Sequence, residues 1–176
     1  MYPIFHIAVP LILTEIPRIK KYKINRFSLI IGALLPDIID KPLFLLSLAD
    51  GRLFSHNLLF VIVSFLIVHI FTKGNKTVSL PFLIGLSSHI ILDLPFVPLF
   101  YPFISYNFYY IEEPLNYWLR KLWTDPLVIS TEITGIFFII FIITYNKLYH
   151  FSDITNYLKG TSQNIIQISK EINKSA

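Results

Sequence analysis

Five long apolar stretches, separated by short polar segments, constrain this chain more than any other feature of its sequence. They cover residues 4–16, 27–49, 57–72, 78–100 and 126–149. A helix needs about 20 mostly apolar residues to cross the hydrocarbon core of a bilayer. The first and third stretches are short, and tilt or local thinning of the bilayer can accommodate them. The pattern predicts an all-α, polytopic integral membrane protein with about five transmembrane helices.

The composition favours the same class. Hydrophobic residues make up 54% and charged residues 15% of the 176-residue chain, and its mean hydropathy is +0.61. An ordinary soluble domain is about 45–50% apolar and about 25% charged. Cysteine is absent, which excludes disulfides and thiolate metal sites. Neither a glycine-rich phosphate loop, nor a nucleic-acid-binding motif, nor the pattern of a cleavable signal peptide is evident. We therefore expect the lipid bilayer, and no nucleic acid, as a partner.

Basic residues are distributed unevenly between the connecting segments. Those after the first, third and fifth stretches carry the excess, whereas acidic residues match the basic ones in the other two. Lys and Arg favour the cytoplasmic side of a membrane. The bias predicts a multi-pass protein of the plasma membrane with its N-terminus outside and its C-terminus in the cytoplasm. We expect one transmembrane domain over residues 1–149 and a polar cytoplasmic tail over 150–176.

The longest connection, residues 101–125, is rich in tyrosine, phenylalanine and tryptophan. Tyrosine and tryptophan prefer the boundary between membrane and water. This composition predicts an interfacial segment on the outer surface. An ordinary loop is the alternative.

Ionisable residues inside apolar stretches are the main indication of function, because burying them is costly in a membrane. With the predicted orientation, most of them fall in the outer half of their stretch or near its middle. These residues are His6, Asp37, Asp40, His56, His89, Asp93 and Glu132. Random placement would spread them over both halves of the membrane. We therefore expect one polar pocket near the outer surface.

The types and spacing of these residues indicate a divalent metal. His89 and Asp93 lie four residues apart and Asp37 and Asp40 three apart, so each pair shares a helix face. Imidazole and carboxylate ligands suit Zn, Mn, Fe or Ni, with Zn and Mn preferred here. A divalent ion would hold neighbouring carboxylates ionised and generate a hydroxide nucleophile from water. At this depth, a lipid-like ester or phosphoester is a natural substrate.

Each assignment has a simpler alternative. The histidines and Asp93 are also consistent with a network of hydrogen bonds between helices, or with an ion relay in a non-catalytic membrane protein. Asp37 is also consistent with a helix cap after Pro36, and Asp40 with a partner of Lys41. Glu132 is also consistent with a hydrogen bond to backbone. Arg52 suits either a substrate phosphate or a snorkelling surface position.

The motifs GALLPDIIDKP, GRLFSHNLLF and GLSSHIILDLP, followed by LFYPF, resemble the membrane-bound metal-dependent hydrolase family. These are YdjM-like inner-membrane proteins, sometimes described as LexA-binding, and the fit is closest to archaeal-type members. The resemblance covers residues 3–103 and extends only loosely to Glu132. Two departures stand out: Asn57 replaces a usual serine, and Gly51 replaces a histidine of some relatives, which removes one candidate ligand.

The resemblance and the residue types together predict a membrane-embedded hydrolase that uses metal-activated water. Asp40 and Glu132 are the candidates for general base or for an outer carboxylate that orients a ligand, and Arg52 and Asn57 are candidates for substrate binding. The predicted metal ligands are His6, Asp37, His56, His89 and Asp93.

Overall fold

The computed structural model describes residues 2–46, 48, 52–107 and 113–160, and every regular element within these ranges is an α-helix. The predicted all-α class is therefore confirmed for this part of the chain. The helices are α1 (Pro3–Leu13), α2 (Pro17–Lys20), α3 (Arg26–Leu45), α4 (Leu58–Phe71), α5 (Lys76–Leu92), α6 (Pro114–Thr124), α7 (Pro126–Tyr145) and α8 (Phe151–Lys159).

The five apolar stretches form α1, α3, α4, α5 and α7. Helix α5 ends at Leu92, earlier than its apolar stretch, because Pro95 and Pro98 follow and proline does not continue a helix. Among the described helices, α7 is long and apolar enough to cross a membrane, with 20 residues and a mean hydropathy of 2.3. Helices α1, α4 and α5 are shorter apolar helices. Five spans therefore stay a prediction.

Polar residues between the apolar stretches decide where four helices begin. The side chain of each N-cap residue accepts a hydrogen bond from a backbone N–H of the first turn, which has no partner within the helix. These caps are Asn25 for α3, Asn57 for α4, Asn75 for α5 and Asp125 for α7. These caps thus fix where α3, α4, α5 and α7 begin.

Helices α3 and α5 form the most extensive contact in the fold. A Cβ atom on Gly32 would overlap the carbonyl oxygen of Phe82, and one on Gly85 would overlap the carbonyl oxygen of Leu29. Small residues let two helix backbones approach this closely. The approach brings His89 of α5 against the backbone of α3.

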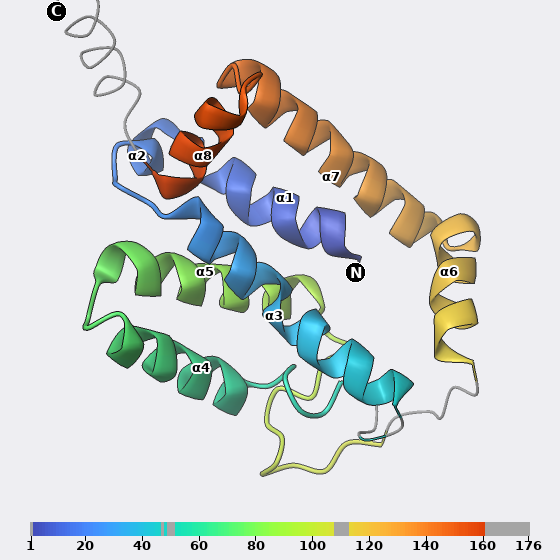
Figure 1. The fold of residues 1–176 in the computed structure, drawn as a ribbon. Helices are drawn as coiled ribbons and strands as arrows, with labels where there is room; N and C mark the ends of the chain where they lie inside the picture. The colour runs from blue at the N-terminus through green and yellow to red at the C-terminus, as the bar shows by residue number, and fades with distance from the viewer. Residues whose placement is uncertain (1, 47, 49–51, 108–112, 161–176) are drawn as a thin grey trace, which may run out of the picture.

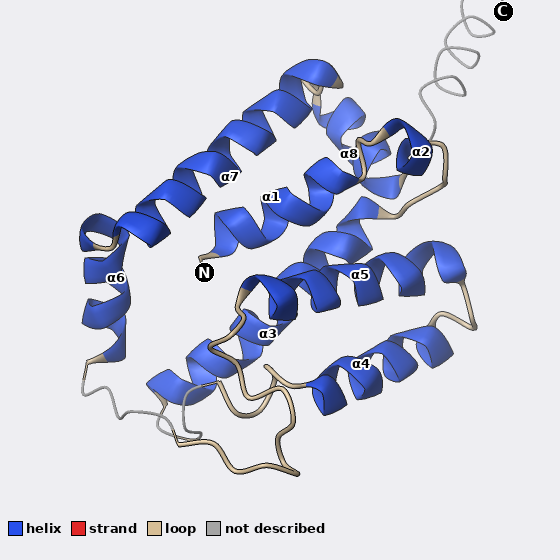
Figure 2. Ribbon diagram, turned by 180° about the vertical axis from the view of Figure 1, so that it is seen from behind, coloured by secondary structure: helices blue, strands red, loops and turns tan. Residues whose placement is uncertain are grey.

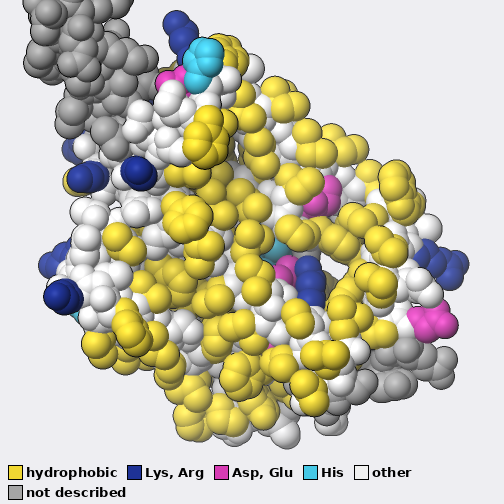
Figure 3. All heavy atoms as spheres, viewed as in Figure 1, with side chains coloured by type: hydrophobic (Ala, Val, Ile, Leu, Met, Phe, Trp, Pro, Cys, Tyr) yellow, Lys and Arg dark blue, Asp and Glu magenta, His cyan; other side chains and the backbone are white. Residues whose placement is uncertain are grey.

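Helix α1 lies between α3 and α7 in both views of the fold (Figures 1 and 2). The buried residues of α7 are Val128, Gly135 and Ile142, seven residues apart, so one narrow stripe of α7 faces the bundle. Most of the surface seen in Figure 3 is hydrophobic. Phe71 and Phe137, for example, are 83% and 65% exposed, whereas several histidines and aspartates are buried. An apolar exterior around a polar interior suits a protein surrounded by lipid.

A group of buried polar residues connects α8 to the segment after α1 and to the start of α3. The Tyr157 hydroxyl donates a 2.8 Å hydrogen bond to Glu15 Oε1, and the Arg26 guanidinium lies 4.2 Å from the Tyr157 ring centroid. Burial raises the pKa of Tyr157, so its hydroxyl keeps the proton that it donates. Arg26 Nε also donates to Thr14 Oγ1 at 3.0 Å.

We expect Tyr157→Phe to destabilise the protein by about 1.5–3 kcal/mol, because it removes a hydrogen bond to a buried charged group. Thermal unfolding in detergent measures the effect. Tyr149→Phe is the matched control, since Tyr149 is 66% exposed. Equal unfolding midpoints for the two variants would contradict a role for Tyr157 in holding α8.

Candidate metal centre

His89 reaches the centre of the bundle from the last turn of α5. Its Nδ1 atom lies 2.6 Å from the Ala33 carbonyl oxygen, and the side chain is fully buried. A carbonyl oxygen only accepts hydrogen bonds, so Nδ1 carries the proton. In the neutral ring, the Nε2 lone pair is therefore left free to face the cluster.

His56 lies in the segment before α4 and is oriented by Asp40 of α3. Its Nδ1 atom is 2.7 Å from Asp40 Oδ2, and the two Asp40 oxygens also lie 3.1 and 3.2 Å from the Ser55 backbone nitrogen. An ionised carboxylate only accepts, so His56 Nδ1 carries its proton. In the neutral ring, the Nε2 lone pair of His56 is left free as well. A carboxylate that fixes a ligand histidine in this way is common around protein-bound metals.

The two free nitrogens face each other at 3.1 Å, Nε2 of His56 to Nε2 of His89. Two lone pairs at this distance repel unless a proton or a metal ion lies between them. The backbone carbonyl and Asp40 hold both rings in this orientation, so neither can relieve the repulsion by exchanging its tautomer.

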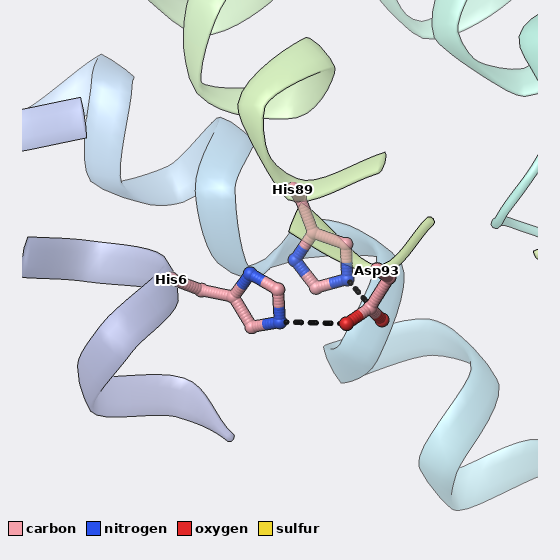
Figure 4. A group of neighbouring side chains, drawn as sticks. All are labelled: His6, His89 and Asp93. Carbon is pink, nitrogen blue, oxygen red and sulfur yellow. Dashed lines mark ion pairs between the residues drawn. The ribbon is translucent and has the colours of Figure 1, made fainter. Parts of the chain in front are cut away.

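His6 of α1 completes a group of three buried histidines. Its ring stacks on that of His89 with 3.9 Å between the ring centroids. Figure 4 shows both rings directing Nε2 toward Asp93, and His6 Nε2 lies 3.3 Å from Asp93 Oδ1. Nδ1 of His6 has no hydrogen-bond partner within the described residues, whereas Nε2 faces the Asp93 carboxylate.

The carboxylates of Asp37 and Asp93 face the same point as the imidazoles. Asp93 Oδ2 lies 3.7 Å from the Nε2 atoms of both His56 and His89, and Asp37 Oδ1 lies 3.7 and 4.0 Å from them. With metal–ligand bonds of about 2.0–2.1 Å, neighbouring ligand atoms lie about 3.0–3.5 Å apart. The observed spacings fit a single ion after a small contraction.

The candidate ligands form two groups of three, and His89 belongs to both groups. They are His6, His89 and Asp93, and Asp37, His56 and His89; within each, the ligand atoms lie within 4.8 Å of one another. A single Nε2 lone pair binds one ion. Each triad outlines a position for an ion beside His89, and the donor set fits the divalent metals expected from the sequence.

Two cations lie beside these carboxylates. Lys41 Nζ is 2.6 Å from Asp37 Oδ2, and Arg52 Nη1 is 3.2 Å from Asp93 Oδ2. Sequence reasoning offered Lys41 as a partner for Asp40, whereas the structure pairs it with Asp37. In Figure 3, acidic, histidine and basic side chains meet in a hollow of the hydrophobic face.

Glu132 and Asn57 have other contacts. Glu132 Oε1 accepts a 3.1 Å hydrogen bond from the Phe5 backbone N–H, which satisfies a free group in the first turn of α1. Asn57 caps α4, and its amide nitrogen donates to the carbonyl oxygens of Leu53 and Phe54. The contact of Glu132 matches the alternative of a hydrogen bond to backbone, and the catalytic role of Glu132 and the substrate-binding role of Asn57 stay predictions. Both side chains are engaged in holding the segments around the cluster.

Sequence reasoning missed the Ala33 carbonyl and Ser55, and it gave Lys41 a different partner. The Ala33 carbonyl left no signal, because it acts through backbone that meets α5 only in the folded chain. Lys41 and Ser55 stand next to Asp40 and His56 in the quoted motifs, so adjacency alone could have indicated them. Gly51 lies outside the described residues, as do the end of the predicted tail (161–176) and residues 108–112 of the aromatic segment.

A model of the YdjM inner membrane protein family matches residues 1–155 of the 176-residue chain. The chain belongs to the YdjM inner membrane protein family. Membership confirms the YdjM-like resemblance and supports location in the plasma membrane. No curated protein and no solved structure matches the chain. Within the YdjM family match lie all the histidines and carboxylates of the cluster.

Replacing Asp40 with asparagine is expected to weaken metal binding about ten- to a hundredfold, because an outer carboxylate of this kind orients the ligand ring. Competition with a chelator of known affinity measures the change. Asp153→Asn in α8 is the control, since it changes the same charge away from the cluster. Affinities equal to that of the wild type would show that Asp40 does not orient His56.

Proposed function

We propose that this protein is a membrane-embedded, metal-dependent hydrolase that acts on a lipid-like ester or phosphoester. The observation that carries the proposal is the 3.1 Å contact between Nε2 of His56 and Nε2 of His89 in a buried site, where two neutral rings direct their lone pairs at each other. A divalent cation makes that contact favourable and also offsets the charges of two neighbouring carboxylates.

In this proposal, His6, Asp37, His56, His89 and Asp93 hold the ion, and Zn or Mn is the preferred metal. Such an ion supplies Lewis acidity and a water that loses its proton near neutral pH. Asp40 keeps His56 in the tautomer that presents Nε2. Glu132 holds the first turn of α1 and thereby positions His6.

We also propose that the chain spans the membrane five times with the N-terminus outside. Basic residues gather around α2, the turn between α4 and α5, and the segment from α7 to α8. The histidine–aspartate cluster lies toward the other ends of α1, α3 and α5. By the bias of basic residues toward the cytoplasm, the cluster would open near the outer surface. Helix α6, which carries Tyr117, Trp118 and Trp123, would then lie at the outer interface.

Elemental mass spectrometry on protein purified without chelator tests the metal directly. We expect one Zn or Mn per chain, and hydrolysis of a lipid ester or phosphoester that a chelator abolishes and added metal restores. Protein that stays free of metal after Zn and Mn are supplied would leave the cluster as a structural polar network or an ion relay.

A further inference from the structure

Two cations, Lys41 and Arg52, stand between the cluster and the surface. Each pairs with a carboxylate that faces the proposed ion, Asp37 and Asp93 respectively. The side chains of Lys41 and Arg52 are 31% and 34% exposed, whereas the two carboxylates are almost fully buried. The cations therefore remain accessible to a ligand that approaches the ion from outside.

The charge of the site changes sign when a divalent ion binds. Asp37, Asp40 and Asp93 carry three negative charges, and Lys41 and Arg52 carry two positive ones. Without an ion, this set has a net charge of minus one and disfavours an anion. A divalent cation makes it plus one and offsets the carboxylate charges to which the two cations are paired. An anion-binding site therefore arises only after the ion is bound.

The surroundings of Lys41 favour a ligand at the level of lipid headgroups. Its Nζ atom lies 5.8 Å from the Tyr2 ring centroid and 6.0 Å from that of Trp118. The Tyr2 hydroxyl donates a 2.6 Å hydrogen bond to the Trp118 carbonyl oxygen, which fixes the two residues together. Tyrosine and tryptophan prefer the membrane–water boundary. The planar fork of Arg52 suits two oxygens of one phosphate.

We propose that Arg52 and Lys41 form an anion subsite beside the metal position, which selects a substrate bearing a phosphate group. This inference rests on the proposed function and names the substrate class of the same site. Metal and phosphate then bind cooperatively, and each raises the affinity of the other by the same factor.

Calorimetric titration of the full chain in detergent, with and without Mn, tests the subsite. The probes are inorganic phosphate, dihexanoyl phosphatidic acid and dihexanoylglycerol, which lacks the phosphate. We expect both phosphate probes to bind the Mn-loaded protein at least about tenfold more tightly than the metal-free protein, a modest coupling between sites. Dihexanoylglycerol should bind far more weakly than the phosphatidic acid. Tighter binding of the phosphatidic acid than of inorganic phosphate identifies a lipid as the source of the phosphate.

Arg52→Gln and Lys41→Gln should each weaken phosphate binding about tenfold, because each removes a charge-assisted contact. Arg52→Lys should recover only part of the loss, since it keeps the charge without the fork. The control is Lys121→Gln on α6, where Lys121 pairs with Asp125, a residue outside the cluster.

Metal content of the same samples separates the two proposals. If the variant that combines Arg52→Gln and Lys41→Gln binds Mn and retains wild-type phosphate affinity, the subsite is wrong and the hydrolase proposal stands. If the wild type binds no metal yet binds phosphate through Arg52 and Lys41, the dependence of the subsite on the ion is wrong and the hydrolase proposal fails as well. Absence of both metal and phosphate binding overturns both.

Discussion

His89→Ala is expected to abolish stoichiometric metal binding. His89 is the residue shared by the two triads of candidate ligands, so its loss removes one donor from each. The remaining histidines are held by different elements, His6 by α1 and His56 by the segment before α4. Elemental mass spectrometry should find the metal in the wild type and less than about a tenth of it in the variant, since loss of a direct ligand should cost at least as much affinity as loss of an outer-shell partner.

His69→Ala is the matched control for this substitution. His69 lies at the end of α4, where its Nδ1 atom is 3.1 Å from Ser79 Oγ, away from the cluster. Metal that binds only the folded state raises the unfolding temperature, so Mn should stabilise the wild type and His69→Ala but leave His89→Ala unchanged. A His89→Ala protein that retains one metal per chain would rule out the proposed ligand set.

The meeting of the histidines and aspartates could be predicted from the sequence because it depends on coarse features. The order of the apolar stretches and the positions of basic residues were enough to place His6, His56 and His89 at the same level. Helical spacing then put Asp93 beside His89 on one face of α5. Neither inference requires atomic contacts: the first uses only the order of the stretches, and the second only the four-residue spacing of His89 and Asp93.

The different partners of Asp37 and Asp40 could not be predicted in the same way. The two residues share a face of α3, so spacing treats them alike. The difference arises because the segment before α4 folds back and places the Ser55 N–H and His56 on Asp40, which leaves Asp37 beside Lys41. That return of the chain depends on tertiary packing rather than on local pattern.

Glu132 illustrates the same limit across two distant elements. The sequence predicted the level of Glu132 along α7, but it did not predict that its partner is the Phe5 N–H of α1. This contact depends on Gly135, because a Cβ atom there would lie 3.0 Å from the Phe5 Cα. The absence of a side chain lets α1 approach α7 closely. A glycine in an apolar helix predicts a close contact with another helix, but the sequence does not indicate which helix that is.

The second large effect is expected at Gly85, which sets the distance between α5 and α3. Alanine normally stabilises an open helix position by about 1 kcal/mol relative to glycine. At Gly85 its Cβ would overlap the Leu29 carbonyl oxygen and lie 2.8 Å from the Ala33 nitrogen. We therefore expect Gly85→Ala to destabilise the protein by about 1–3 kcal/mol, as overpacking does, and Gly85→Leu to prevent folding.

Gly85→Ala should also weaken metal binding, because His89 lies four residues further along the same face of α5. Separation of the two helices draws His89 Nδ1 away from the Ala33 carbonyl that orients it. Thermal unfolding and metal content, measured on the same samples, report the two effects. Ile84→Ala is the control on the outer face of α5, where Ile84 is 54% exposed. If Gly85→Ala raised the unfolding temperature instead, the close approach of α3 and α5 could not be what positions His89.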